Sequence, residues 1–165
     1  MVRIFEGRHV LMDQEMIREV VERRCPFAAR AGMRVVLIGP DRVELAMEET
    51  GENLNAFGLV HAGAICGLAE TAAGIALFRH LDPSRVLVLN TVLNIRFTHP
   101  PRGRLTAAVR VLPEEAAALM EEFEEKGRAD KALDVKVFDS AGNMVAQAQA
   151  TFRLVKPRPE FTGAS

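Results

Sequence analysis

Cysteine is scarce in this chain, because only Cys25 and Cys66 occur among its 165 residues. Two cysteines lack the number and the spacing of a disulfide framework or of a zinc site. Cys66 stands in an apolar stretch, where a buried, unreactive thiol is expected rather than a nucleophile. This sparse use of cysteine is consistent with a reducing cytoplasm, where we expect the protein to work.

Neither sign of charge dominates, since 21 basic and 22 acidic residues leave a formal net charge of −1. Nothing therefore marks the whole surface for nucleic acid or membrane, and we expect neither as a partner. Charged residues interrupt the stretch from Met1 to His9, which shows no secretory signal. The run from Ala62 to Phe78 is shorter than the roughly 20 residues of a membrane span and contains Glu70, so we interpret it as a helix buried in protein.

Length and composition fit one domain, because nearly half of the residues (48%) are hydrophobic and can form a substantial core. We expect a single domain over residues 1–165, with its core at about 26–155. Helical periodicity predicts an N-terminal helix at about 13–25 and an inserted, Ala/Glu-rich helix at about 113–126. The tail 156–165 is expected to fray.

Strand patterns occur on both sides of the long apolar helix. Branched residues and polar–apolar alternation, bounded by turn residues, predict strands at 33–38, 42–47, 86–97, 105–112, 133–138 and 144–154. The helix from His61 to His80 is apolar nearly all round, so other structure should wrap it. Asp13 is expected to cap the N-terminal helix and Pro26 to end it. The order predicts an α+β fold in which an antiparallel sheet curls around one long central helix.

Two residues of the apolar helix carry chemistry: Gly63 at its start, and Glu70, the only acid within it. The N–H groups of a first helical turn lack intrahelical partners, so the Gly63 N–H can stabilise an oxyanion. An unpaired buried carboxylate costs several kcal/mol, so Glu70 either faces solvent at a helix edge or has a purpose. Seven residues separate the two groups by about 10 Å. Two antiparallel helices related by a twofold axis would instead bring each Gly63 to the other subunit's Glu70.

The helix start resembles a known family. It reads Gly58-Leu59-Val60-His61-Ala62-Gly63 and then Leu68-Ala69-Glu70-Thr71. This is similar to hotdog-fold acyl-CoA thioesterases, in particular the branch of phenylacetyl-CoA and hydroxybenzoyl-CoA thioesterases, whose helix start reads Gly-x-x-His-Gly-Gly followed by Leu-Ala-Glu or Leu-Ala-Asp. The wider resemblance covers about residues 26–154, including the hairpin turn from Asp139 to Asn143. It is specific for the fold and for thioesters rather than for the acyl group.

The resemblance implies a hotdog fold and a thioesterase that converts an acyl-CoA or acyl-carrier-protein thioester to free acid and thiol. Glu70 would act as nucleophile or as general base on water, and both roles stay open. The Gly63 N–H would contact the oxyanion, and His61 would orient the thioester carbonyl. Asn55 matches a family position that holds Gln or Asn and positions the attacking water or the thioester.

Two departures from the family pattern bear on activity. Ala62 replaces the first glycine of the usual pair, and Gly74 stands where some relatives carry a Ser or Thr that helps the chemistry. Thr71 is adjacent to Glu70 and is a further candidate for substrate binding. A small basic group near a turn could pair with CoA phosphates or be a solvated turn: His99, Arg102 and Arg104.

The leading hypothesis is therefore a thioesterase that works as a homodimer or as a homotetramer built from two dimers. Its partners would be an acyl-CoA substrate and itself, with no metal and no cofactor besides the CoA of the substrate. A non-catalytic acyl-CoA sensor is one alternative, which Ala62 and Gly74 keep open. A hotdog dehydratase or hydratase is another, which Glu70, deep in the helix, disfavours.

Overall fold

A computed structural model of the chain describes residues 13–157. The stretch from Met1 to His9 and the part of the expected tail beyond residue 157 lie outside the described residues. In chain order, the elements are α1 (Gln14–Glu19), the π-helical turn η1 (Val20–Arg24), α2 (Pro26–Arg30), β1 (Met33–Ile38), β2 (Arg42–Met47), α3 (Ala62–Phe78), β3 (Leu87–Phe97), β4 (Leu105–Arg110), α4 (Pro113–Lys126), β5 (Arg128–Phe138) and β6 (Met144–Val155).

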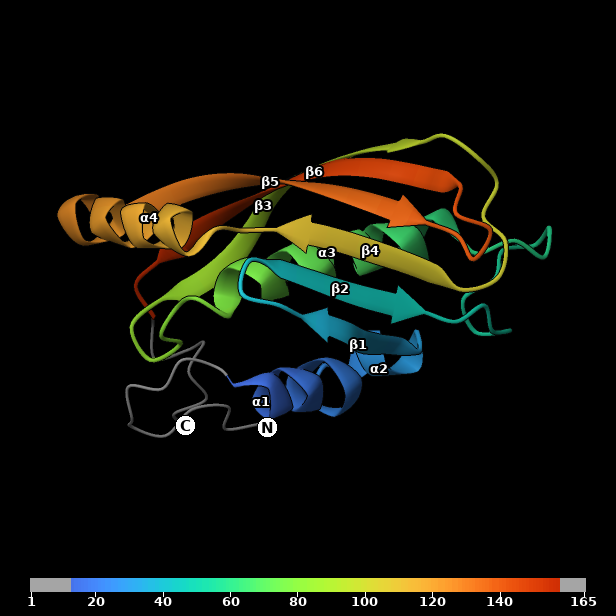
Figure 1. Cartoon of the computed structure of the whole chain (residues 1–165), viewed down its shortest axis with the longest axis horizontal. Coiled ribbons are helices and arrows are strands. Elements are labelled where there is room, and N and C mark those ends of the chain that lie inside the picture. Colours follow the sequence, from blue (N-terminus) through green and yellow to red (C-terminus); the bar gives the residue numbers. More distant parts are fainter. Residues whose placement is uncertain (1–12, 158–165) are drawn as a thin grey trace.

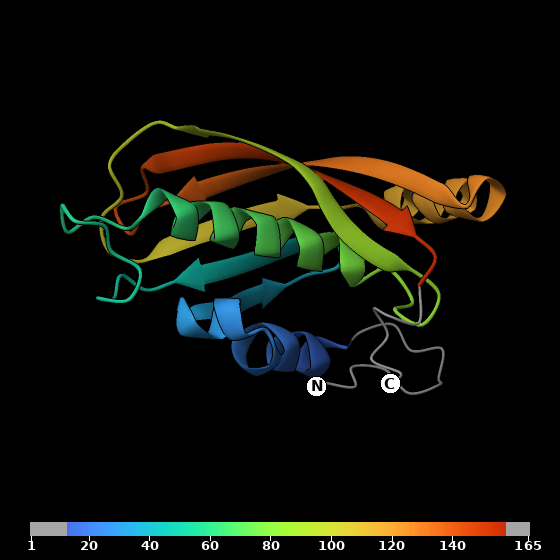
Figure 2. The same ribbon diagram turned by 180° about the vertical axis from the view of Figure 1, so that it is seen from behind.

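The six strands form one antiparallel sheet in the order β1-β2-β4-β5-β6-β3 (Figure 1). The sheet curls around α3, and β3 crosses the later turns of this helix (Figure 2). Helix α4 lies at one end of the sheet, against β5. The predicted α+β architecture, an antiparallel sheet around a long central helix, is confirmed.

The N-terminal helix differs in its second half from the prediction. Asp13 caps α1 as expected, because its carboxylate accepts a 2.7 Å hydrogen bond from the backbone N–H of Met16. The helix then widens into η1, and Cys25 adopts an extended conformation (φ −93°, ψ 100°), as favoured before a proline. Pro26 was expected only to end a helix, but it also begins α2, since its fixed φ suits a first helical position.

The strands agree with the sequence patterns within two residues, apart from β5. It begins at Arg128, five residues before the predicted start at Leu133. The charged residues of this segment hid the strand: Lys131 forms an ion pair with Glu115 of α4 (2.7 Å), and Arg128 and Asp130 lie on the exposed face. There Arg153 of β6 donates two hydrogen bonds to Asp130, of 2.7 and 2.9 Å. Such cross-strand charge pairs favour a paired, solvated sheet face.

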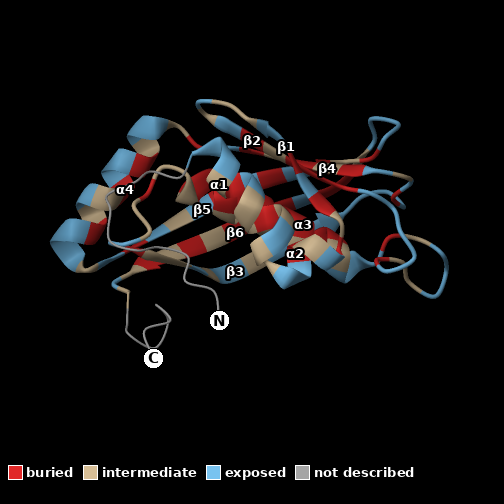
Figure 3. Ribbon diagram, turned by 90° about the horizontal axis from the view of Figure 1, so that it is seen from below, coloured by how far each residue is buried: buried red, intermediate tan, exposed pale blue. Residues whose placement is uncertain are grey.

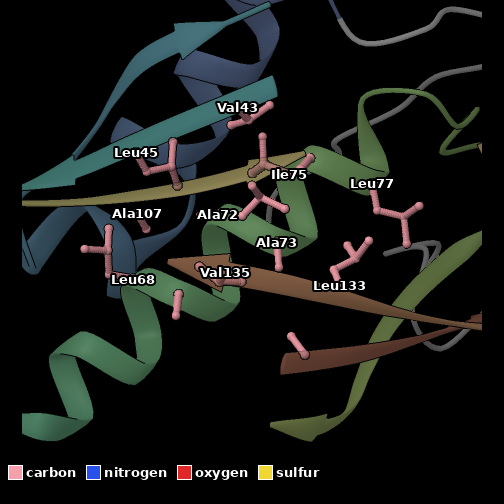
Figure 4. Close-up of a cluster of buried hydrophobic side chains, with 14 of the residues drawn as sticks. Val43, Leu45, Leu68, Ala72, Ala73, Ile75, Leu77, Ala107, Leu133 and Val135 are labelled. Carbon is pink, nitrogen blue, oxygen red and sulfur yellow. The ribbon is translucent and has the colours of Figure 1, made fainter. Parts of the chain in front are cut away.

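The core lies between α3 and the concave face of the sheet. Buried side chains of α3, including Leu68, Ala72 and Ile75, pack towards strand residues of which Figure 4 labels Val43, Leu45, Ala107, Leu133 and Val135. One stripe of α3 is only half-buried, against the expectation that other structure wraps this helix. In the middle turns, that stripe is composed of Cys66, Gly67, Glu70, Thr71 and Gly74.

The two edges of the sheet are finished differently. On β1, Arg18 of α1 donates to the carbonyl of Val35 (2.6 Å), and Glu22 accepts from the N–H of the same residue (3.0 Å). Side chains of the N-terminal helical segment therefore occupy backbone groups of this edge. Within the described residues, β3 pairs on one side only, with β6, and it exposes Leu89, Val92 and Phe97. Figure 3 shows exposed segments along β3 in the same region.

Candidate active site

His61 holds the start of α3 in place. Its backbone is extended (φ −63°, ψ 136°), and its Nδ1 accepts a 2.8 Å hydrogen bond from the N–H of Gly63. The backbone N–H of His61 donates to the carbonyl of Asn53, also at 2.8 Å. The neutral ring therefore carries its proton on Nε2, and the ring is exposed. His61 therefore caps the helix through Nδ1 and leaves its Nε2–H as a free donor on the exposed ring.

Gly63 lies beneath this ring at the exposed helix start. A Cβ atom at this position would come within 3.0 Å of Nδ1 and 3.3 Å of Cε1 of His61, so glycine leaves the space in which the ring folds back. The N–H that sequence analysis assigned to an oxyanion is thus occupied by His61 in this structure. A substrate oxygen that uses this donor must displace the imidazole.

The loop before α3 is built on two asparagines. Asn55 Oδ1 accepts hydrogen bonds from the N–H groups of Phe57 (2.9 Å) and Leu59 (3.2 Å), which leaves its Nδ2 as the group available to a substrate. Asn53 is only 4% exposed. Its Nδ2 donates to the carbonyls of Ala31 and Glu48, at 3.3 and 2.7 Å. Asn53 therefore joins the end of α2 to the loop that carries Asn55.

Glu70 lies two turns further along α3, on the half-buried stripe. Burial raises the pKa of its carboxyl above the ordinary value, and a hydrogen bond with the Thr71 side chain opposes this effect only in part. A raised pKa brings a carboxylate closer to the range in which general bases work. Thr71, expected as a substrate-binding residue, interacts here with the candidate carboxylate.

Two glycines on the same stripe have different surroundings. An added Cβ at Gly74 would lie 3.4 Å from the Phe152 ring, an ordinary contact, so the position is not closed to the hydroxyl residues of some relatives. At Gly67 an added Cβ would lie 2.4 Å from Cε1 of Phe27. The Phe27 ring consequently rests on the helix backbone, in a space that only glycine leaves free.

Two clefts flank the first turns of α3. A larger one, of about 710 Å³, is lined by Pro26, Phe27, Arg30, Ala31, Glu52, Asn53, Leu54, His61, Gly63 and Ala64. A smaller one, of about 370 Å³, is lined by Asn55, Leu59, Val60, Ala62, Ile65, Phe97, Thr98, His99, Pro100 and Pro101. The candidate residues are thus divided: His61 and Gly63 face one cleft, and Asn55 and His99 the other. Glu70 lines neither of these two clefts within the described residues.

The basic group lies beside the smaller cleft, at the turn after β3. His99 Nδ1 is 3.1 Å from the carbonyl of Met144, and Arg104 forms an exposed ion pair with Glu48 (3.5 Å). Arg102 is exposed, and its carbonyl accepts from Ser140. Glu48 offsets the charge of Arg104 and solvent screens the remaining positive charge, so the site is a weak phosphate contact on its own.

Other reactive chemistry is sparse around this site. Burial raises the pKa of the Cys66 thiol, which opposes thiolate formation and agrees with an unreactive cysteine. Between residues 13 and 157, no cluster of three His, Cys, Asp or Glu side chains is suited to a metal ion. Within the same range, every helix is too short or too polar to traverse a lipid bilayer.

Two residues of the site were missed by sequence reasoning. Phe27 and Asn53 were not among the expected site residues, whereas Asn55 was. The signal for Asn53 was weak, because two asparagines two residues apart in a polar loop look alike until one of them is buried. The contact between Phe27 and Gly67 joins segments 40 residues apart, and no local pattern encodes it.

Comparisons with known proteins agree with this architecture. The model of a family described as "Domain of unknown function (DUF4442)" matches residues 13–154. A crystal structure of a Pseudomonas aeruginosa protein of unknown function, described as a probable thioesterase, is similar over 91% of this chain and 100% of its own, with 29% identity and a TM-score of 0.82. No curated protein matches this sequence.

Two further solved structures show the same fold at lower identity. A Chlorobaculum tepidum protein of unknown function is 17% identical over 87% of this chain and 94% of its own, with a TM-score of 0.78. A Haemophilus influenzae thioesterase is 16% identical over 90% and 94%, with a TM-score of 0.71. The fold is therefore the hotdog fold, and the resemblance to hotdog-fold thioesterases stated from the sequence is confirmed.

Proposed function

The chain belongs to the DUF4442 family, and we propose that it is a thioesterase that hydrolyses an acyl-CoA or acyl-carrier-protein thioester to a free acid and a thiol. The observation that carries the proposal is Glu70, a half-buried carboxylate with a raised pKa on the one stripe of α3 that the sheet leaves uncovered. Thioesterases among the proteins of similar fold support it.

The chemistry needs one base or nucleophile and one oxyanion donor. As general base, Glu70 would take a proton from a water molecule that adds to the thioester carbonyl carbon. The carbonyl oxygen gains negative charge, which the Gly63 N–H stabilises once His61 has moved aside. Collapse then breaks the C–S bond, and the thiolate recovers the proton from Glu70. As nucleophile, Glu70 would instead attack the carbonyl carbon and expel the thiolate, which forms an acyl anhydride. Water then hydrolyses the anhydride to the free acid and Glu70, and the thiolate takes up the released proton.

Both groups act on one carbonyl only if two copies of the chain combine. Gly63 and Glu70 are seven residues apart on one straight helix, or about 10 Å along its axis. The open edge β3, with Leu89, Val92 and Phe97 exposed, offers a surface for a second copy, whereas side chains of α1 and η1 occupy the edge at β1. We propose a homodimer with two sites, each combining Gly63 of one copy with Glu70 of the other.

No metal and no cofactor besides the CoA of the substrate enters this scheme. The nucleotide end of CoA would lie towards His99, Arg102 and Arg104, next to the smaller cleft, where guanidinium groups suit phosphates. We propose the cytoplasm as the location, where acyl-CoA is available as a substrate.

Thiol release from a panel of acyl-CoA thioesters, followed with a thiol reagent, tests the activity. The wild-type protein should release CoA from some members of the panel, and Glu70→Ala should reduce the rate by about two orders of magnitude or more while the fold and the dimer survive. Wild-type turnover in Glu70→Ala would contradict the role of Glu70.

Mixed dimers test the shared site. Glu70→Gln and Gly63→Val subunits, each inactive alone, should regain about a quarter of the wild-type rate when exchanged in equal amounts, because half of the dimers then hold one intact site. No recovery, despite subunit exchange proven by mass spectrometry, would contradict the two-copy arrangement.

An acyl-CoA sensor is the second candidate function. It is favoured by the bond from the Gly63 N–H to His61, which leaves the oxyanion donor occupied in this structure. A sensor would bind acyl-CoA without releasing thiol from any member of a broad panel, and the same assay combined with calorimetry separates the two.

A further inference from the structure

The larger cleft runs from the start of α3 to α2. Its walls include His61 and Gly63, where the thioester carbonyl is proposed to lie, and Pro26 and Phe27 of α2. Its volume, about 710 Å³, is in the range of small-molecule sites. A group attached to the thioester carbonyl can therefore enter this cleft directly.

Phe27 occupies a special place in the wall of this cleft. Its ring lies so close to Gly67 that a Cβ there would approach to 2.4 Å, which places the ring about one turn from Gly63 and one turn from Glu70. The residue is nevertheless 56% exposed, so much of its apolar surface has no covering from its own chain. One face of the Phe27 ring thus packs against α3, and the opposite face is exposed.

The rest of the wall is firmly held. The buried Asn53 joins the carbonyls of Ala31 and Glu48, which ties α2 to the loop on the opposite side. The charged residues of the cleft, Arg30 and Glu52, are both exposed and of opposite sign. The cleft therefore offers an apolar interior without a net charge for phosphate.

We propose that this cleft is the acyl subsite, and that the Phe27 ring, seated on Gly67, is the residue that limits the length of the acyl group. The inference rests on the proposed thioesterase function and adds the substrate class: thioesters of uncharged, apolar acyl groups. The acyl arm enters beside α2, and the CoA arm leaves on the other side of α3, towards the basic turn.

Binding of S-alkyl-CoA thioethers, which cannot be hydrolysed, tests the subsite by calorimetry without turnover. In the wild-type protein, affinity should rise by about fourfold for each added methylene and then level off where the chain meets Phe27. In Phe27→Ala the levelling should move to longer chains. Gly67→Ala, which displaces the ring, should also change the limit, and Phe57→Ala, which removes an 89% exposed ring outside the cleft, should leave it unchanged.

An unchanged chain-length limit in Phe27→Ala would overturn the proposal. So would loss of the dimer in that variant with the same limit, which would make Phe27 a contact between subunits. Thiol release measured in parallel distinguishes failure of the acyl subsite from failure of the proposed thioesterase function. A shifted limit without hydrolysis of any thioester would refute the thioesterase and leave the subsite, whereas hydrolysis with an unchanged limit would do the reverse.

Discussion

The N–H of Gly63 and Nδ1 of His61 are joined by a 2.8 Å hydrogen bond at the start of α3. The imidazole thereby satisfies one of the helix donors that would otherwise face solvent. It also competes with any substrate oxygen for that donor. His61 consequently has two separable roles, as helix cap and as orienting group for a thioester, and two substitutions distinguish them.

Replacing His61 by Asn should keep the cap and remove the ring, because asparagine is a favoured N-cap residue. His61→Ala removes both and should lower the free energy of unfolding by about 1 kcal/mol. If the ring orients the thioester, both variants lose thiol release, although only His61→Ala loses stability in denaturant titrations. A fully active His61→Asn protein would show that His61 serves only as the N-cap of α3.

Glu70→Gln should stabilise the protein at neutral pH while it abolishes hydrolysis. Burial raises the pKa of Glu70, so the folded state binds the proton more tightly than the unfolded state. The ionised form therefore destabilises the fold at pH values above the ordinary carboxyl range. The gain in melting temperature from Glu70→Gln should be largest above the raised pKa and should vanish as pH falls below the unfolded value.

The same titration should appear in catalysis. Only the ionised carboxylate can act as base or nucleophile, so kcat/KM should fall as pH drops through the raised pKa. Glu121→Gln, at an exposed position of α4, is the matched control and should change neither the pH profile nor the melting temperature. Equal melting temperatures for wild type and Glu70→Gln at every pH would show that Glu70 is solvated.

The sequence predicted this part of the site because a helix has a fixed geometry. Once the run after His61 is read as one helix, the separation of Gly63 from Glu70 follows from the rise per residue. Phe27 could not be placed in this way, since its position on Gly67 depends on how α2 docks, and α2 itself was not predicted. Likewise, the early start of β5 was hidden by charged residues that only cross-strand pairing makes compatible with a strand.

A lysine on the open edge of the sheet should separate the proposed dimer. Val92 on β3 is 44% exposed, and Val92→Lys would place a charge on the apolar strand that a second copy is expected to cover. Val36 on β1, 42% exposed, is the matched control, because α1 already occupies backbone groups of that edge. Light scattering should find monomers for Val92→Lys and dimers for Val36→Lys, and dimers of both variants would exclude β3 as the interface.

Asn55→Asp should distinguish the structural role of Asn55 in the loop from its role in catalysis. The carboxylate keeps the acceptor oxygen that holds the N–H groups of Phe57 and Leu59, but it lacks the Nδ2 donor. If that amide positions water or the thioester, kcat/KM falls by about tenfold or more at unchanged stability, consistent with loss of a buried hydrogen bond. Asn53→Ala should behave oppositely, because it removes three side-chain hydrogen bonds from a 4% exposed residue and should lower the free energy of unfolding by about 1–3 kcal/mol. An Asn55→Asp protein with wild-type kinetics would show that the residue serves the turn alone.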